Sequence, residues 1–257
     1  MCHRYSFGWF TAKKLIVFCV CQMLLIAARS QNPILVECMN INKTYVSTPY
    51  LSFNVKYKYS LDSLPTVIMD SSQGVFKMNG YKYWGKIDSV EMLQNDSFAI
   101  TVFKQDKIIS LATPSYNFSQ TLPLAQWDSL FFQSDRFTFT MGVDSIWKKI
   151  TVNYSPNLPY KKLEMWYDSV TYQINRIKYS VSEYAGEQNF YSLSSPGAYG
   201  IVDIQFSNYQ TGAFNDSAFN HWVYIANYGG VYEPSSAYSE GYQLYISSPG
   251  LANNGGR

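Results

Sequence analysis

Apolar and polar residues alternate along much of the chain. The clearest case is the segment 51–60, whose odd positions are all apolar: Leu51, Phe53, Val55, Tyr57 and Tyr59. This period of two is typical of a strand with one buried and one solvated face. Eight of the eleven aspartates are followed by serine, and both side chains accept backbone hydrogen bonds in turns. Strands separated by such turns indicate an antiparallel meander.

Further strands are predicted along the rest of the chain. They are expected at 74–78, 81–92, 98–103, 107–111, 137–143, 147–154, 160–167, 172–184 and 201–206, with weaker signals at 219–226 and 242–247. Within 172–184 the apolar phase shifts by one residue between Ile174 and Ile177. That shift predicts a β-bulge near Asn175 or Arg176, which would bend the sheet.

One segment breaks the alternation with helical spacing. In 124–132 the apolar side chains that share one helical face are Leu124, Trp127, Leu130 and Phe131. A short helix here is expected to lie over the sheet as a lid. The predicted fold class is therefore mainly β: a single antiparallel, strongly curved sheet, an open or half β-barrel, with a short helical lid around 124–132. Residues 31–50 are expected to form an N-terminal arm or a short helix.

Residues 1–30 have the pattern of a signal peptide. Positive charges precede an apolar stretch from Leu15 to Ala28, and small residues stand before an expected cut that leaves Gln31 first. The apolar stretch is shorter than the roughly 20 residues that span a bilayer, although an N-terminal membrane anchor is the alternative. After cleavage we expect no membrane span, one β domain over 51–248 and a disordered tail at 249–257.

Removing this leader changes the charge and the cysteine content. It holds four of the 20 basic residues and no acidic one, so the remainder has 16 basic against 18 acidic side chains. Such a balance provides no excess of positive charge with which to bind the phosphates of a nucleic acid. Cys38 is then alone, which excludes an intrachain disulfide. An exported protein without a disulfide fits a Gram-negative periplasm; the cell surface or the extracellular space are alternatives.

The residues for common catalytic and metal sites are scarce. After the leader, His221 is the sole histidine, and no Gly-x-Ser-x-Gly elbow accompanies it. With Cys38 as the other soft ligand, neither a zinc site nor any other metal or cofactor site is predicted. Two carboxylates outside turn-like contexts, Glu164 and Asp203, are the best candidates for a glycosidase pair. We nevertheless expect no catalytic residues.

The block from Gln73 to Asp96, continued by Phe98 to Ser110, resembles the outer-membrane lipoprotein carrier family (LolA/LolB-like) in its Bacteroidota style. The stretches 162–167 and 204–209 resemble the second half of that family, so the resemblance spans about 51–210. It implies an unclosed, helix-lidded β-barrel that binds the acyl chain of a lipid or lipoprotein without catalysis.

Three functions follow as hypotheses. In the first, an apolar ligand contacts the inward side chains Phe53, Val55, Val75, Phe98, Ile100, Phe139, Met141, Met165, Ile204 and Phe206. The same residues would otherwise form a solid core. In the second, the protein is an interaction module whose exposed tyrosines bind another envelope protein. The third is a carbohydrate-active enzyme that uses Glu164 and Asp203.

Overall fold

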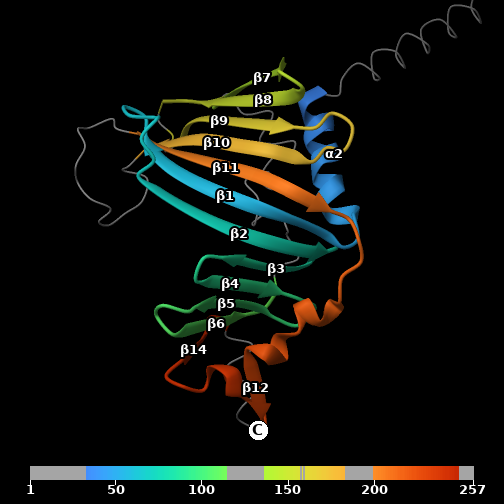
Figure 1. Ribbon diagram of the computed structural model, residues 1–257, viewed down its shortest axis with the longest axis vertical. Helices are drawn as coiled ribbons and strands as arrows, with labels where there is room; N and C mark the ends of the chain where they lie inside the picture. Colours follow the sequence, from blue (N-terminus) through green and yellow to red (C-terminus); the bar gives the residue numbers. More distant parts are fainter. Residues whose placement is uncertain (1–32, 115–135, 157, 159, 183–198, 249–257) are drawn as a thin grey trace, which may run out of the picture.

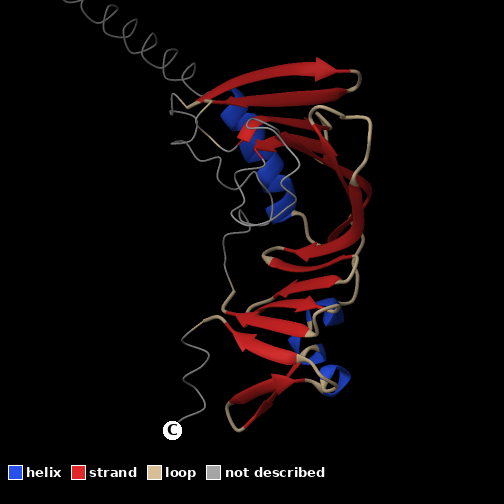
Figure 2. Ribbon diagram, turned by 90° about the vertical axis from the view of Figure 1, so that its left-hand side faces the viewer, coloured by secondary structure: helices blue, strands red, loops and turns tan. Residues whose placement is uncertain are grey.

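The computed structural model describes residues 33–114, 136–156, 158, 160–182 and 199–248. Most of the strands in these residues belong to one large curved sheet (Figures 1 and 2), and two others pair separately. The sheet has 12 strands in the order β14-β6-β5-β4-β3-β2-β1-β11-β10-β9-β8-β7. Its two edges, β14 and β7, lie far apart, so the sheet is not closed. The predicted fold class, mainly β with an open curved sheet, is confirmed.

Two meanders meet in the middle of this sheet. The first consists of β1 (Leu51–Leu61), β2 (Asp70–Asn79), β3 (Lys82–Ile87), β4 (Val90–Gln94), β5 (Ala99–Phe103) and β6 (Ile108–Ala112). The second consists of β7 (Phe137–Asp144), β8 (Trp147–Tyr154), β9 (Tyr160–Tyr167), β10 (Ile174–Ser182) and β11 (Tyr199–Gln210). Pairing of β1 with β11 joins them. One pair departs from the expected antiparallel arrangement, because β14 (Gln243–Ile246) runs parallel to β6.

Helix α2 (Pro33–Ser47) covers one face of the second meander. Of the two alternatives for residues 31–50, the structure shows a helix, and it is 15 residues long. Its buried side chains recur at helical spacing: Ile34, Cys38, Ile41 and Tyr45. Proline is favoured at the first helical position, where no N–H is needed. The helix lies on the concave side of the sheet (Figure 2). We call this side the concave face.

The apolar side chains form two clusters on opposite faces. In β4, Met92 packs against the cluster that contains α2, and its neighbour Leu93 belongs to the other cluster. Successive side chains of a strand point to opposite faces, so the clusters lie on opposite sides of the sheet. The second cluster is covered by the C-terminal segment, which consists of η5 (Asp216–Phe219), η6 (His221–Val223), β12 (Ile225–Tyr228), β13 (Val231–Pro234) and η7 (Ser236–Tyr238).

The predicted bulge is present at the start of β10. The register with β9 shifts between Ile174 and Arg176, which leaves Asn175 as the extra residue. Both Ile174 and Ile177 are thereby buried in the concave-face cluster. Arg176 points to the other face, where its guanidinium donates two hydrogen bonds of 2.7 Å to Asp203. The phase shift in the sequence is therefore explained by a residue inserted on one strand.

Most described Asp-Ser pairs lie in turns, as predicted. At Asp168 the carboxylate accepts hydrogen bonds from the backbone N–H groups of Val170 and Thr171. These bonds lower the pKa of Asp168. Asp88 and Ser89 make the tight turn that divides the predicted strand 81–92 into β3 and β4. Asp70 is an exception, because it begins β2.

The C-terminal third departs most from prediction. The weak strand expected at 219–226 is wrong over most of its length, because η5 and η6 occupy that region until β12 begins at Ile225. The side chains of Asn215 and Asn220 cap these turns by accepting from Ser217 and Trp222 N–H groups. The strand expected at 242–247 is confirmed as β14. The predicted lid at 124–132, the leader and the tail at 249–257 lie outside the described residues.

Candidate functional site

The concave face of the sheet is the candidate site, and its middle is filled by α2. The ring of Phe53 is buried here, with Tyr45 of the helix in an edge contact at 5.9 Å between centroids. Phe76 stacks on Phe53 at 5.6 Å, and Phe206 lies at 5.9 Å. This part of the face is a packed core in which the helix supplies the apolar partner.

The predicted ligand-contacting residues fall into four places. Phe53, Val55, Met165, Ile204 and Phe206 are buried together beside α2, and Phe139 packs against their cluster. Met141 lies on the edge strand β7 and is 43% exposed.

The remaining predicted positions do not share this face. Phe98 and Ile100 belong to the second cluster, on the opposite side of the sheet, so their assignment to one inward set with Phe53 is corrected. Val75 lines a hollow that is also on the opposite side. The reason is that β2 and β5 point these side chains away from α2. The lid positions Leu124, Trp127, Leu130 and Phe131 lie outside the described residues.

A group of tyrosines continues the concave face along the strands, away from Phe53. We call Tyr57, Tyr154, Tyr160 and Tyr179 the aromatic wall. Their ring centroids are 5.5 Å apart for Tyr154 and Tyr160, and 6.2 Å apart for Tyr160 and Tyr179. Tyr57, Tyr154 and Tyr179 are partly buried and pack against the concave-face cluster.

The wall is apolar in its chemistry although its rings carry hydroxyl groups. Burial raises the pKa of Tyr154 to about 12, and the neighbouring Tyr160 adds to the effect. Burial likewise raises the pKa of Tyr57 and of Tyr179. All three phenols are thus neutral at physiological pH. A row of neutral rings offers broad apolar surface with polar groups at its rim.

Polar contacts hold both halves of α2 to the sheet. Glu37 accepts a hydrogen bond of 2.9 Å from the Lys148 ammonium and one of 2.7 Å from the Tyr167 hydroxyl. Near the other end of the helix, Tyr45 contacts Tyr209 and the backbone of Ile174. Burial, followed by the contact with Glu37, raises the pKa of Tyr167. The helix is therefore fixed by specific bonds as well as by apolar packing.

The two carboxylates considered for glycoside hydrolysis lie on the face opposite α2. Glu164 forms ion pairs of 2.7 Å with both Lys149 and Lys162. Burial alone would raise the pKa of Glu164, but the hydrogen bonds from these lysines outweigh it and lower the pKa. Asp203 is paired with Arg176, and Lys178 of β10 is the register neighbour of both acids. These partners give both carboxylates a structural role.

His221 packs into the C-terminal segment. Its Nδ1 lies 2.9 Å from the side-chain amide nitrogen of Asn95, and its ring contacts Phe98 and Trp222. Burial lowers the pKa of His221. Among the described residues, no three His, Cys, Asp or Glu side chains are grouped as a metal site would require.

No family model matches the chain, and no curated protein matches it. Solved structures do match its fold at probability 1.00. An uncharacterized conserved protein from Thermus thermophilus has 6% identity and a TM-score of 0.47, over 84% of this chain and 99% of that one. A LolA superfamily protein from Nitrosomonas europaea has 10% identity and a TM-score of 0.33, over 72% and 96%.

The Mycobacterium tuberculosis lipoprotein LppX has 13% identity and a TM-score of 0.34, over 72% of this chain and 99% of that chain. The family named from the sequence is thus also found among the structural matches. Among the described residues, no helix combines the length and the apolar character needed to cross a bilayer.

Sequence reasoning missed two parts of this site. The stripe on α2 was hidden because Asn40, Asn42 and Thr44 interrupt it with polar residues of low helix propensity. The tyrosines of the wall were not among the predicted ligand-contacting residues, although Tyr57 and Tyr179 lie in the apolar phase of their strands. Their alternation with Lys56, Lys58, Lys178 and Ser180 was the signal that places them on the buried face.

Proposed function

We propose that this protein is an exported, non-enzymatic envelope protein that binds an apolar ligand, the acyl chain of a lipid or lipoprotein, on the concave face of its open sheet. One observation carries the proposal: the aromatic wall extends the buried core as a partly buried apolar surface. The packed core beside α2 would support the wall from one end, and it contains Phe53, Val55, Met165, Ile204 and Phe206. Burying apolar surface contributes about 25 cal/mol per Å², so an acyl chain laid along the wall gains affinity by contact alone.

Lipid content and fatty-acid uptake test this function. The protein would be purified without detergent, and extracted lipid identified by mass spectrometry. Titration with the fluorescent fatty acid cis-parinaric acid should then show saturable binding. Replacing Tyr57 and Tyr179 together by alanine should weaken binding about tenfold or more, because each removed ring loses well over 1 kcal/mol of apolar contact.

A matched control separates the wall from tyrosine content in general. Tyr245→Ala removes a ring that is 53% exposed on β14, at the far edge of the sheet. It should leave cis-parinaric acid binding unchanged. Absence of co-purified lipid together with absence of saturable uptake would overturn the proposal.

A second candidate function is favoured by the edge strand β7. This strand pairs only with β8 among the described strands, and it exposes Met141 and Val143 at 43% and 74%. An edge strand can accept an added strand from another envelope protein. A Val143→Lys variant should abolish such association and leave fatty-acid uptake intact.

A further inference from the structure

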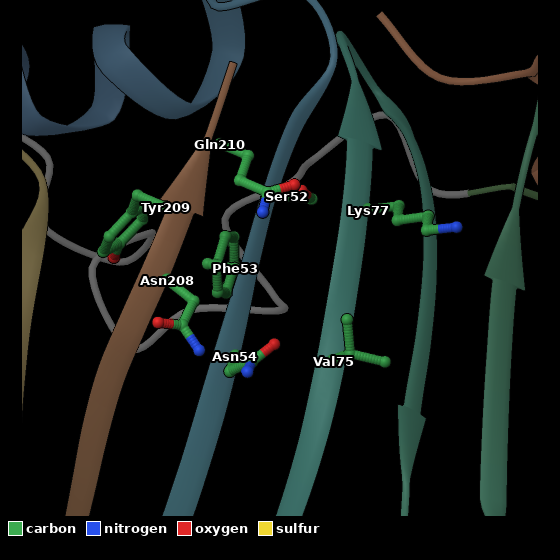
Figure 3. A pocket seen from close by; sticks show the side chains of 8 residues that line it. All are labelled: Ser52, Phe53, Asn54, Val75, Lys77, Asn208, Tyr209 and Gln210. Atoms are coloured by element: carbon green, nitrogen blue, oxygen red, sulfur yellow. The ribbon is translucent and has the colours of Figure 1, made fainter. Parts of the chain in front are cut away.

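A hollow of about 490 Å³ opens where β1, β2 and β11 run side by side (Figure 3). It lies on the face opposite α2, since Phe53 and Tyr209 point into the concave-face cluster and their strand neighbours point the other way. The lining includes three carboxamides, a hydroxyl and an ammonium: Asn54, Asn208, Gln210, Ser52 and Lys77.

A local irregularity in β11 produces this hollow. The register of β1 with β11 shifts between Ser52 and Asn54, which pair with Gln210 and Ser207. Two residues of β11, Asn208 and Tyr209, therefore oppose one residue of β1. Asn208 adopts a left-handed backbone conformation with φ of 54°, which asparagine tolerates better than most residues. Such a bulge bends the strand and interrupts the regular pairing with its neighbour, which redirects the side chains at that point.

The polar side chains of the hollow are not used by the fold. Among the described residues, the side chains of Ser52, Asn54, Asn208 and Gln210 form no hydrogen bond with protein groups. Each carboxamide both donates and accepts hydrogen bonds, as the hydroxyl groups of a saccharide do. The hollow is within the roughly 300–1,000 Å³ range of small-molecule sites. Its chemistry therefore matches a polyhydroxylated ligand of disaccharide size.

The charge around the hollow is positive. Lys77 stands 5.6 Å from the ring centroids of Trp84 and Phe214 and pairs with no carboxylate of the described residues. Lys86 is the register partner of Val75, so it flanks the hollow on the β3 side. The nearest acid across from Lys86 is Glu91, and that carboxylate is already bonded to Lys104 at 2.6 Å.

From this geometry we infer that the hollow binds an acidic saccharide unit. Its hydroxyl groups would bond to the carboxamides of Asn54, Asn208 and Gln210, and its carboxylate would pair with Lys77. A bare phosphate offers hydrogen-bond acceptors, so it could bond to the ammonium and to the amide N–H groups but would leave the three carboxamide oxygens unmatched. The site lies across the sheet from the aromatic wall and is independent of the proposed acyl-chain binding.

Calorimetry on the mature protein with digalacturonic acid and with its uncharged dimethyl ester tests the inference. The acid should bind, and the ester should bind at least about tenfold more weakly, since a hydrogen bond to a charged group is worth roughly 1.5–3 kcal/mol. Lys77→Gln should weaken binding of the acid by a similar factor and leave binding of the ester unchanged. Asn208→Gly keeps the left-handed backbone conformation accessible, and it should weaken binding of both ligands.

Lys58→Gln is the matched control, because Lys58 lies on the same face roughly 13 Å along β1 from Asn54. It should leave binding of both ligands unchanged. Circular dichroism and uptake of cis-parinaric acid should be unaltered in Asn208→Gly, which separates this site from the aromatic wall and shows that the variant folds.

Two results would overturn the inference. One is the absence of digalacturonic acid binding at millimolar concentration. The other is equally strong binding of inorganic phosphate or phosphatidylglycerol vesicles, sensitive to Lys77→Gln but not to Asn208→Gly. The latter result would identify a simple anion or headgroup site.

Discussion

Tyr45 of α2 and Tyr209 of β11 close a ring of three hydrogen bonds with the backbone of Ile174. The Tyr209 hydroxyl donates to the Ile174 carbonyl oxygen at 2.7 Å, and the Ile174 N–H donates to the Tyr45 oxygen at 3.0 Å. Because the single hydroxyl proton of Tyr209 is used in that bond, Tyr45 is the donor in the 2.5 Å contact between the two hydroxyls. The ring satisfies the backbone of Ile174 next to the β10 bulge and ties three elements together.

Replacing Tyr45 by phenylalanine should destabilise the protein by about 1–3 kcal/mol, since it leaves the buried Ile174 N–H without a partner. Tyr209→Phe should have a similar effect through the Ile174 carbonyl. Because both variants break the same ring, the double variant should cost clearly less than the two single costs combined. Urea denaturation of the three variants measures this coupling.

Tyr245→Phe is the control, since among the described residues the Tyr245 hydroxyl bonds only to the exposed Gln243 side chain. Its free energy of unfolding should stay within about 0.5 kcal/mol of the parent. Strict additivity of the Tyr45 and Tyr209 effects would contradict the ring.

Glu37→Gln should destabilise the attachment of α2. The Glu37 side chain is 13% exposed and accepts from both Lys148 and Tyr167. The amide keeps the shape but removes the charge and turns one acceptor into a donor that faces Tyr167 or Lys148. We expect a loss of about 1–3 kcal/mol in the free energy of unfolding. The exposed Glu233→Gln serves as the reference, and equal effects of both variants would show that Glu37 has no special role.

Gly74→Ala should be costly although alanine adds a single methyl group. A Cβ at this position would overlap the Lys86 carbonyl oxygen and lie 2.9 Å from Cγ1 of Ile87. Relief of that overlap requires β2 and β3 to separate, for which we expect about 1–3 kcal/mol. Gly142→Ala is the paired control, because a Cβ there meets nothing within 4 Å. Thermal unfolding should rank the two variants, and a neutral Gly74→Ala would refute the close strand approach.

The sheet could be predicted because its signals are local. Alternation at 51–60 and Asp-Ser turns such as Asp168 each act within a few residues, and the phase shift at Asn175 is a direct trace of the bulge. The covering elements could not be predicted in the same way. Helix α2 is stabilised by packing on the sheet and by the bonds of Glu37. Those bonds join Glu37 to residues more than 100 positions away in the sequence.

The assignment of faces failed where two elements cover the sheet from opposite sides. Phe98 and Ile100 alternate as regularly as Phe53 and Val55, and period-two alternation does not tell which side of the sheet a strand buries. The C-terminal segment makes the side opposite α2 the apolar one at β5. The two lysines at the hollow were not identified for the same reason, because Lys77 and Lys86 reach the same part of the sheet only through strand register.

His221 should make stability fall as the solution becomes mildly acidic. The Asn95 side-chain oxygen accepts from the N–H groups of Ser97 and Phe98, so its amide group donates to Nδ1 of His221 and selects the neutral imidazole. Burial lowers the folded-state pKa below the unfolded value near 6.5.

Above that value both states hold a neutral His221 and no stability is lost. As pH falls below it, the unfolded chain binds a proton that the folded protein resists, so stability declines until the folded pKa is reached. For a single titrating group, the free energy of unfolding cannot fall by more than about 1.4 kcal/mol per pH unit. Urea denaturation from pH 7.5 down to about 5 should show this decline in the parent.

His221→Gln should remove that decline, because glutamine can accept the same hydrogen bond from Asn95 and does not titrate. The other histidine, His3, is common to both proteins. Glu164 and Asp168 have lowered pKa values, so their contributions are lost at still lower pH and do not enter this range. A variant that keeps the full pH dependence of the parent would show that His221 titrates freely in the folded protein and that its packing against Phe98 is not protective.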